Sequence, residues 1–538
     1  MDIHYRLCRG AIQRKSRRKA GLRPGIITKM REIVIFGTAE RANEVYKILL
    51  YLPEYKVVAF SDNNPSKWGT RKFGLDVISP NDIKYQYTNA TVIIASSYYF
   101  DIGMQLIKND LLPKGGFLDS VNSVIGMLSD PEKIELKKKI QTPIIYHNLD
   151  YREVKFQEDD DGTGKYLVIC NGGYPKEGNP RCAFAHRRVL KYAENKINIE
   201  AFGYIENAPF DEYEYQGIQV YEGGMLELQH LLTSKTYKKI LIHFVGKAVM
   251  YCIHRAKKME TQMIVWCHGY EVMPWFRTWF NYTNDEIEQC SEMWNREDGK
   301  RKEFLREIFR LTNIHFIFVS NYLKERVKKF VGELPVNYSI IHNFIDSKFY
   351  TVSDKQPESR QYILSIKSHM TRMYANDLTA KVILELAKRE FFSKLTFELY
   401  GDGILFEENF EELQKRNYSN VHIHKEFLSQ EQIRELFGRN GIFLSPTRAD
   451  SQQVISGEAM SAGMAVITCN VGAINEFMNE ECASLSEYEN YFMMAEEIEY
   501  LYFHPEEYLK KCKNARIRAE KQCGYDNTIQ KEIDLILQ

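Results

Sequence analysis

The residues with the clearest chemical potential are two acids, Asp450 and Glu458, which lie eight positions apart. From Pro446 to Thr468 the chain reads PTRADSQQVISGEAMSAGMAVIT, so a loop of small and polar residues separates the acids and a small-residue helix follows. The apolar strand GIFLSP comes before this segment. Carboxylates can bind hydroxyl groups, and the free amides at a helix start can bind an anion. The unit is therefore suited to a polyhydroxylated, phosphorylated ligand.

Within this unit we expect Asp450 on the loop and Glu458 in the first turn of the helix. An N-cap aspartate and an exposed helical glutamate are the plainer alternative, and they would imply no ligand. If a ligand binds, the backbone amides between the acids should point at its anionic group. These amides belong to Ser451, Gln452, Gln453, Val454 and Ile455.

Two cations, Lys367 and Arg372, follow a second expected strand in the stretch YILSIKSHMTRMYAND. Opposite a helix N-terminus, such a pair can neutralise a diphosphate leaving group, and each contact would stabilise the transition state by roughly 2–4 kcal/mol. A lone Lys/Arg pair on a loop is usually only solvated. The presence of Asp450 and Glu458 in the same chain favours the interpretation as a ligand site.

The elements that would position these residues form three blocks in which strands and helices alternate. Two successive parallel α/β blocks predict facing Rossmann-like domains, preceded here by a smaller one, and ligands in such folds bind beyond the carboxyl ends of strands. The last segment is expected to pack back on the N-terminal half of the two larger blocks. The expected boundaries are 1–29 (basic tail), 30–129 (small parallel α/β domain), 130–165 (linker and lead-in strand), 166–343 and 344–505 (the two larger blocks) and 506–538 (C-terminal helices).

The bulk composition excludes several classes of protein. At 538 residues the chain is too long for one hydrophobic core. Lysine plus arginine equals aspartate plus glutamate at 72 each, so the positive bias of nucleic-acid-binding proteins is absent. The ten cysteines include no CxxC pair, which argues against a zinc or redox motif and fits a reducing cytoplasm. No apolar run approaches the roughly 20 residues that span a bilayer, and we expect no signal peptide.

The first residues depart from this neutral balance. Residues 1–31 hold ten Lys or Arg and one acid. A solvated tail is the simplest interpretation. Peripheral contact with an anionic membrane, at the inner face of the plasma membrane, is the sharper alternative, because each basic residue near such a surface contributes about 1 kcal/mol. Nucleic acid is the least favoured partner.

From Tyr166 to the C-terminus the chain resembles the family-4 glycosyltransferases, which are retaining enzymes of the GT-B fold. The family's acid-x7-acid motif appears as Asp450-SQQVISG-Glu458 before AMSAGMAVI, and its upstream cation pair appears as Lys367-x4-Arg372 with the cation types exchanged. The chain departs from the family in having Asp450 where glutamate is commoner. Further agreements are IHNFID (341–346), YGDG (400–403) and VGAINE (471–476), while Ala465 replaces a usual proline and Phe344 a usual glycine.

The resemblance implies transfer of a sugar, with retention, from a nucleotide sugar to a glycan or polyprenyl-linked acceptor in bacterial cell-surface polysaccharide or glycolipid biosynthesis. Lys367 and Arg372 would hold the diphosphate, Glu458 the ribose and Asp450 the donor sugar, with Gly401 and Asp402 of YGDG on the donor side. No cofactor or metal is implied. The run at 159–161, DDD, imitates the metal-binding DxD motif of another fold but falls in the charged linker.

In the preceding block (166–343), His268 of WCHGYEV lies where the family places a histidine facing the donor sugar; a structural histidine is the alternative. The acceptor is expected near two loops of this block. Its candidate residues are Glu271 and Arg277 after His268, and Gly172, Gly173, Arg181 and His186 in the loop NGGYPKEGNPRCAFAHRR, whereas His342 and Asn343 at the domain crossover are expected to be structural.

The first block resembles the small Rossmann-like domain fused to polysaccharide-biosynthesis enzymes. Its glycine fingerprint, Gly37-x-Ala39-x-x-Ala42, keeps only the first glycine, which argues against a nicotinamide oxidoreductase. Asp62 ends the second expected strand, where a ribose-binding acid would lie, so nucleotide binding and a structural or docking role both stay open. Two alternatives remain for the whole chain: a non-catalytic, glycosyltransferase-like partner subunit and a nucleotide-binding regulatory protein. The partner subunit should have lost the cations or the acids, and both pairs are present.

Overall fold

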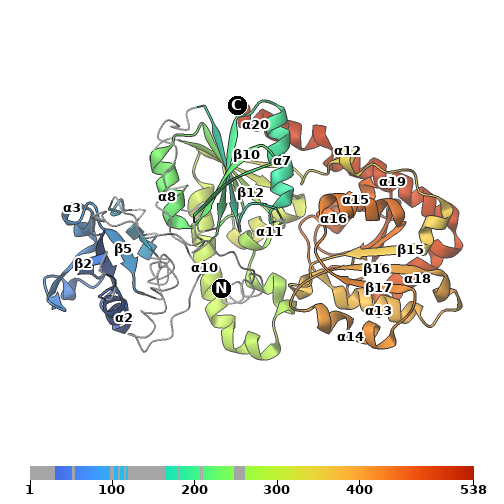
Figure 1. The fold of residues 1–538 in the computed structure, drawn as a ribbon, viewed down its shortest axis with the longest axis horizontal. Helices are drawn as coiled ribbons and strands as arrows, with labels where there is room; N and C mark the ends of the chain where they lie inside the picture. The colour runs from blue at the N-terminus through green and yellow to red at the C-terminus, as the bar shows by residue number, and fades with distance from the viewer. Residues whose placement is uncertain are drawn as a thin grey trace, which may run out of the picture. The chain divides into compact units, whose positions relative to one another are not determined.

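The computed structural model of the chain describes residues 31–96, 102–113, 117–118, 164–246, 252 and 261–538, except for positions 51, 53–54, 104, 107–108, 178, 180, 206–207 and 209 (Figure 1). The expected basic tail (1–29) and the DDD run (159–161) lie outside the described residues. The chain divides into two compact units at Met263/Ile264.

The first sheet is built from residues 31–118 and has six strands in the order β3-β4-β2-β1-β5-β6. Its core is made by apolar side chains such as Ile35, Val45 and Phe60. The sheet is mixed rather than purely parallel, because β3 runs antiparallel to β4. This hairpin was not expected from the sequence. Its elements are β1 (Arg31–Phe36), α2 (Glu40–Leu49), β2 (Tyr55–Ser61), β3 (Arg71–Lys72), β4 (Leu75–Ile78), β5 (Thr91–Ile94) and β6 (Phe117–Leu118).

The second sheet has eight strands in the order β14-β13-β12-β11-β7-β8-β10-β9. Of these, β9 runs antiparallel to β10, which corrects the expectation of a fully parallel block. β9 reads DEYEY and lacks the apolar run of a buried strand. The strands are β7 (Tyr166–Asn171), β8 (Ile199–Tyr204), β9 (Asp211–Tyr215), β10 (Ile218–Gly223), β11 (Lys239–His243), β12 (Gln262–Cys267), β13 (Ile314–Phe318) and β14 (Tyr338–Ile340), and the helices include α7 (Ala183–Glu194), α8 (Met225–Ser234), α10 (Asn284–Phe309) and α11 (Asn321–Val331).

The third sheet is parallel throughout and has the order β17-β16-β15-β18-β19-β20. Its central strands are buried on both faces, and Figure 1 shows α15 and α16 on one face and α13 and α14 on the other. Its elements are β15 (Tyr362–Ile366), α13 (Asn376–Leu386), β16 (Thr396–Gly401), α14 (Phe406–Arg416), β17 (Val421–Lys425), α15 (Gln430–Arg439), β18 (Ile442–Leu444), α16 (Val454–Ser461), β19 (Ala465–Cys469), β20 (Ala483–Ser486) and α18 (Tyr491–Phe503).

From β15 the chain adds β16 and β17 on one side, and then returns to add β18, β19 and β20 on the other side. The direction of strand addition therefore reverses between the neighbouring strands β15 and β18. At such a reversal the two following loops diverge and leave a crevice at the carboxyl ends, where ligands of doubly wound folds bind. The α/β class predicted from the sequence is therefore confirmed.

The chain ends in two helices, α19 (Pro505–Cys523) and α20 (Ile529–Leu537). Trp266 in β12 donates its indole Nε1–H to Glu532 in α20 at 3.0 Å, and the Ile345 amide donates to Cys523 O at 2.9 Å. Among the described residues, none of the helices combines the length and the apolar character needed to cross a membrane.

Candidate functional site

The reversal point of the third sheet brings together Lys367 and Asp450. β15 pairs with β18 (Leu364 opposite Phe443), so the loops that follow them start side by side. Lys367 lies directly after β15 and is buried, and its Nζ donates to the carbonyl oxygen of Pro446, 2.5 Å away on the loop after β18. The ammonium group is thereby held at the loop that carries Asp450.

Burial dominates the electrostatics of this pair. It lowers the pKa of Lys367 to about 8, although the nearby Asp450 carboxylate raises that pKa in part. It also raises the pKa of Asp450, while Lys367 and the amides of Gln452 and Ser451 lower it in part. The opposite charges of Lys367 and Asp450 attract each other, but burial removes the water that would solvate either charge. An arriving anion with sugar hydroxyls would supply partners to both.

The YGDG loop packs against the backbone of the segment that begins with Lys367. Gly401 ends β16 with φ +157°, and a Cβ there would lie 1.9 Å from the Lys367 carbonyl oxygen, so only glycine fits this approach. The Asp402 carbonyl accepts the His369 amide at 2.9 Å, and the Asp402 carboxylate accepts the amide of Gly403 at 2.7 Å. In this structure both predicted donor-side residues shape the loop of Lys367, and direct ligand contact stays a prediction.

The acid-bearing loop corrects two expectations. α16 begins at Val454, so Glu458 lies in its second turn, not its first, and its side chain is buried rather than exposed. Asp450 is not the N-cap, because Gln453 holds that position. The reason is local: Asp450 accepts the Gln452 amide at 3.0 Å, which turns the chain before the helix can start. The alternative of an N-cap aspartate and an exposed helical glutamate is therefore wrong for both residues, while their contact with a ligand stays a prediction.

The side chains of Gln452 and Gln453 point inward. Gln452 bonds both backbone groups of Asn343, accepting from its amide at 2.6 Å and donating to its carbonyl at 3.1 Å. Gln453 donates to Ser445 O and accepts from Ser456 Oγ. The Gln452 amide is also occupied by Asp450. The Ser451 amide also interacts with Asp450, and donor contact through the amides of Ser451, Gln452, Gln453, Val454 and Ile455 stays a prediction.

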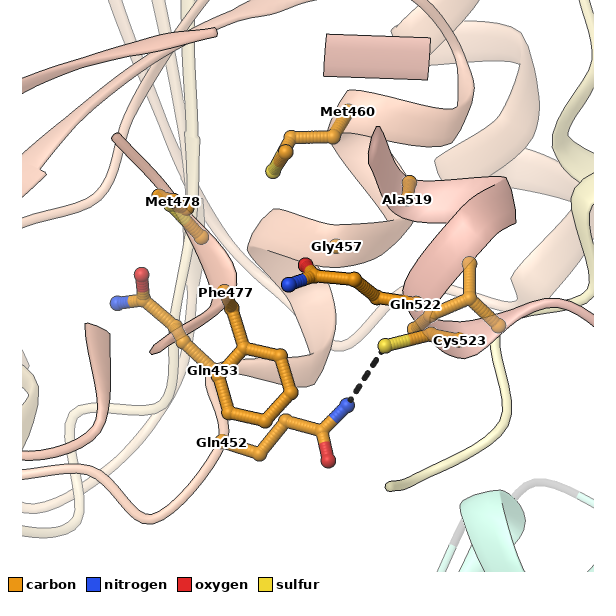
Figure 2. Close-up of a pocket in the computed structure, with 10 residues that line it drawn as sticks. Gln452, Gln453, Gly457, Met460, Phe477, Met478, Ala519, Gln522 and Cys523 are labelled. Atoms are coloured by element: carbon orange, nitrogen blue, oxygen red, sulfur yellow. Dashed lines mark hydrogen bonds between the residues drawn. The ribbon is translucent and has the colours of Figure 1, made fainter. Parts of the chain in front are cut away.

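A small pocket lies near the same segment but does not qualify as a substrate site (Figure 2). It has room for a water molecule rather than for a nucleotide sugar. Gln452 Nε2 donates to Cys523 Sγ at 3.4 Å at its border. The pocket lies where α16 packs near α19, and it is lined by Ile345, Gln452, Gln453, Gly457, Met460, Phe477, Met478, Ala519, Gln522 and Cys523.

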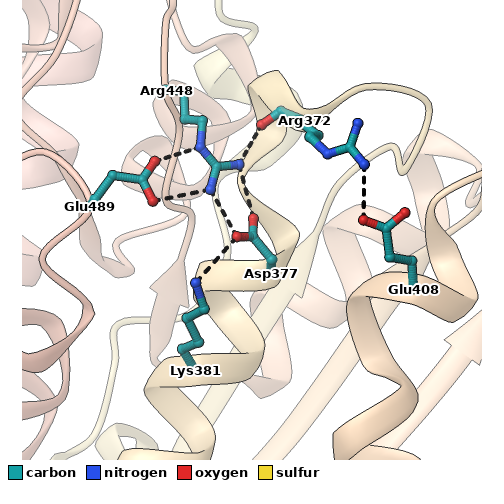
Figure 3. Close-up of polar contacts among 6 residues, drawn as sticks. All are labelled: Arg372, Asp377, Lys381, Glu408, Arg448 and Glu489. Atoms are coloured by element: carbon teal, nitrogen blue, oxygen red, sulfur yellow. Dashed lines mark hydrogen bonds and ion pairs between the residues drawn. The ribbon is translucent and has the colours of Figure 1, made fainter. Parts of the chain in front are cut away.

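The second predicted cation, Arg372, begins the short helix η7 (Arg372–Tyr374). Its guanidinium donates to Glu408 at 3.0 Å and is partly exposed (Figure 3). The structure does not pair it with Lys367. A surface ion pair of this kind exchanges easily in water, so Arg372 can still turn toward an anion, and its role stays a prediction.

Arg448 is a residue of the site that sequence reasoning missed. It makes paired bonds to Asp377 (2.9 and 2.8 Å) and to Glu489 (2.5 and 3.1 Å), and it donates to the Arg372 carbonyl at 2.7 Å (Figure 3). The two carboxylates raise the pKa of Arg448 above its usual value despite its burial. Arg448 therefore fixes the backbone on which Arg372 stands. Its position in PTRADS, two residues before Asp450, was the available signal.

Across from the acids lies the loop after β12, which carries His268. The buried carboxylate of Glu271 accepts the amides of His268 (2.5 Å) and Gly269 (2.9 Å), and burial raises the pKa of Glu271 to about 7. In this structure Glu271 orders its own loop, and its contact with an acceptor stays a prediction. Arg277 donates to the hydroxyl of Tyr322 in α11. The roles of His268 and Arg277 stay predictions.

Gly269 is a second residue that the sequence analysis missed. Its φ is +156°, and a Cβ there would lie 2.7 Å from Ser451 Oγ. The loop of His268 therefore lies against the loop of Asp450, and a side chain at position 269 would require the Ser451 hydroxyl to move and a backbone conformation that favours glycine. The glycine next to His268 was the only local signal.

At the crossover, two residues have the structural contacts expected of them. His342 Nδ1 lies 2.9 Å from Val319 O, and Asn343 bonds Gln452 as described above. Glu476 of VGAINE also reaches across, because its carboxylate accepts the amides of Asn321 (2.8 Å) and Tyr322 (3.0 Å) at the start of α11.

The comparisons with known proteins identify this part of the chain. Residues 361–503 match the model of the family described as glycosyl transferases group 1. Solved structures share the fold at low identity: the HepE protein of Anabaena in complex with UDP and glucose (14 % identity, 69 % of this chain and 99 % of that one, TM-score 0.52) and sucrose-phosphate synthase from Thermosynechococcus elongatus (13 %, 70 % and 98 %, 0.52). The chain carries a glycosyltransferase domain in a GT-B fold. Among curated proteins, none matches the sequence.

Residues 29–112 match a second family model, described as C2185-like, N-terminal. In this C2185-like domain, Asp62 accepts bonds from the Lys67 ammonium at 2.8 Å and from the Thr38 hydroxyl. Burial alone would raise the pKa of Asp62, but these bonds lower it below its usual value. The acid placed where a ribose could bind thus serves an internal ion pair in this structure.

Four acceptor candidates, Gly172, Gly173, Arg181 and His186, lie in the other unit. Gly172 and Gly173 follow β7, and Arg181 is exposed, so their acceptor role stays a prediction. The acceptor role of His186 also stays a prediction. Its ring is buried, with Nδ1 2.8 Å from the Tyr174 hydroxyl and Nε2 3.0 Å from Gln216 Oε1, and burial lowers its pKa to about 4. Within the described residues of the whole chain, no group of three potential metal ligands occurs.

Proposed function

We propose that this protein is a retaining glycosyltransferase of family-4 type that moves a hexose from a nucleotide sugar to a glycan or lipid-linked acceptor. The observation that carries the proposal is the meeting of Lys367 and Asp450 at the reversal point of the third sheet, inside the segment that matches the group 1 glycosyl transferases. HepE, which shares the fold, is a complex with UDP and glucose, so UDP-glucose is the first donor to test. Residues 166–343 would be the acceptor domain and 344–505 the nucleotide-sugar domain.

In this proposal the charges of the site act on the departing nucleotide. Lys367 and Arg372 stabilise the diphosphate as its negative charge grows, and the start of α16 adds its positive dipole end. Together they supply the positive charge that a metal ion provides in other glycosyltransferases. Glu458 binds the ribose and Asp450 the sugar hydroxyls. Arg448 holds the loop of Asp450 and the backbone of Arg372, and Glu271 holds the loop of His268.

The C-terminal helices support the same division of the chain. Trp266 of β12 bonds Glu532 of α20, which ties the end of the chain to the second sheet. We propose that residues 506–538 pack back on the acceptor half in this way. The resemblance further supports a place in bacterial cell-surface polysaccharide or glycolipid biosynthesis, in the cytoplasm or at the inner face of the membrane.

A thermal-shift screen of the full chain with UDP-, GDP-, ADP- and CMP-sugars tests the proposal. A ligand present at about 100 times its Kd should stabilise the protein by about 2.7 kcal/mol. The nucleotide sugar that shifts the melting temperature is then incubated with the protein without acceptor. We expect slow hydrolysis, in which NMR detects free sugar released in the anomeric form of the donor. A shift without sugar release would favour a nucleotide-binding regulatory protein or a partner subunit, and no shift with any of the four classes would contradict the proposal.

A further inference from the structure

Directly after the loop of His268, the surface carries large aromatic side chains. Tyr270, Phe276 and Trp279 are 55 %, 53 % and 54 % exposed. Phe276 and Trp279 both belong to the short helix η5 (Trp275–Asn281). Folded proteins seldom leave neighbouring large apolar side chains in water without an interaction that uses them. We call Phe276 and Trp279 the aromatic platform.

The aromatic platform is anchored to α10 by the neighbouring residue Trp275. Trp275 donates its amide to Asp298 Oδ2 at 2.9 Å and its indole Nε1–H to Asn295 Oδ1 at 2.8 Å, both on α10. Its ring packs on Trp294 with centroids 4.8 Å apart. The anchoring aromatic side chain therefore faces α10, while the two platform side chains are left to solvent. A surface held in this way loses little conformational entropy when it binds a ligand.

The platform also lies beside the proposed transfer site. η5 contacts η7 (Arg372–Tyr374), the segment with the predicted diphosphate-binding arginine. Within η5, Arg277 donates to Tyr322 in α11. A few positions earlier, Gly269 brings the same chain segment against Ser451. An acceptor whose end reached Asp450 and His268 would pass over or next to the platform.

The surrounding charge selects the kind of partner. α10 starts just after η5, and its first half carries four exposed acids, Asp285, Glu286, Glu288 and Glu292. The same half carries one exposed base, Arg296, and η5 itself carries Arg277, which donates to Tyr322. Acids still outnumber bases on this stretch, which disfavours anionic lipid headgroups and anionic polysaccharides. A neutral glycan is not repelled, and its pyranose rings present flat C–H faces that stack on aromatic rings while their hydroxyls stay in water.

We propose that Phe276 and Trp279 form a subsite that binds the neutral glycan chain of the acceptor by stacking. The proposal rests on the proposed function, since it assigns the chemical class of the acceptor to the same site. It places the growing chain, rather than its reacting end, on η5. A second sugar ring, one or more residues away from the reacting hydroxyl, is the part that stacks.

Isothermal titration of the full chain with neutral gluco-, manno-, galacto- and N-acetylglucosamine oligosaccharides tests the subsite. At least one series should bind to the wild type, and Phe276→Ala combined with Trp279→Ala should weaken that binding by about tenfold or more. Trp279→Tyr should restore part of it. Tyr85→Ala removes an aromatic side chain that is 80 % exposed in the C2185-like domain, and it should change nothing.

Three outcomes would overturn the subsite: no binding of any neutral series by the wild type at millimolar concentration, equal affinity in the double variant, or binding to phosphatidylcholine vesicles that the double variant loses. The thermal shift with the nucleotide sugar separates this result from the proposed function. If the donor shift is absent in the wild type but glycan binding depends on the platform, the proposed function fails and the subsite stands. An unchanged donor shift in the double variant shows that it is folded.

Discussion

At the scale of single residues, the site is a pair of opposite charges held where water is scarce. Lys367 is fastened to the Pro446 carbonyl, and burial shifts its pKa and that of Asp450 toward the neutral forms. Such a pair costs free energy in the empty protein and regains it when a charged ligand arrives. The chemistry of these two residues therefore depends on pH in a range that can be measured.

The affinity for the donor should fall as pH rises through the pKa of Lys367, about 8 in the empty protein. Only the protonated ammonium attracts a diphosphate, so binding is strongest below this pKa and weakens above it. We expect the donor KM to rise about tenfold for each pH unit well above this point, with kcat less affected. Steady-state kinetics from pH 6.5 to 10 would show it; a flat KM would mean that Lys367 does not meet the donor.

Loss of either Arg372 or Glu458 should reduce turnover by about 100-fold or more with the fold intact. Arg372→Ala removes a partly exposed side chain, so stability should change little. For the buried Glu458, Glu458→Gln keeps the volume of the side chain. Arg416→Ala is the matched control, because this arginine pairs with Glu412 on α14 at the surface. Rates near wild type in both variants would refute the site assignment.

At the scale of elements, three loops are held by contacts that span long stretches of chain. Arg448 links the loop after β18 to Asp377 at the start of α13, to Glu489 and to the carbonyl of Arg372 (Figure 3). Gly269 lets the loop after β12 reach Ser451. These contacts explain how short loops without regular structure can present charged groups in fixed positions.

Replacing Arg448 by methionine should destabilise the protein by roughly 1–3 kcal/mol, because Glu489 then loses this cation and Asp377 keeps only the longer pair with Lys381 at 3.7 Å (Figure 3). It should also raise the donor KM, since the backbone under Arg372 loses its support. Urea unfolding and donor kinetics on one preparation measure both effects. Arg416→Met should change neither. Lost stability with an unchanged KM would mean that Arg448 supports the fold but not the site.

At the scale of the whole molecule, residues far apart in the chain join at the start of α11. Glu476 accepts the amides of Asn321 and Tyr322, and His342 packs edge-on against Phe477 with centroids 4.7 Å apart. A carboxylate at a helix N-terminus is favourable for the dipole and for the free amides. This contact connects the segment before the crossover to the segment after β19.

Glu476→Ala should lower the free energy of unfolding by about 1 kcal/mol and raise the donor KM, because both sides of the crossover lose a shared anchor. Glu480→Ala is the control, since Glu480 is an exposed acid of the same region. Thermal unfolding and donor kinetics check the prediction. A KM that stays unchanged would show that the contact is only structural.

Much of this protein could be predicted from its sequence. Alternating apolar runs such as YILSI and AVITC predicted the strands, and the acids and cations stood at their carboxyl ends. These signals are local, because burial on both faces and the position after a strand leave a mark on neighbouring residues. The hairpin β3–β4 and the strand β9 escaped because short or charged strands at a sheet edge leave no such mark.

What only the tertiary structure decided is which groups are already occupied. Gln452 bonds a residue 109 positions away and Glu476 one 155 positions away, and no periodicity reports such pairs. The structure thereby gave Gln452, Gln453 and Glu271 supporting contacts, showed the His186 ring buried between two partners, and added Arg448 and Gly269. The sequence by itself determined the kinds of group that can do the chemistry. The folded chain alone determines their partners, because burial and hydrogen bonds are made between distant segments.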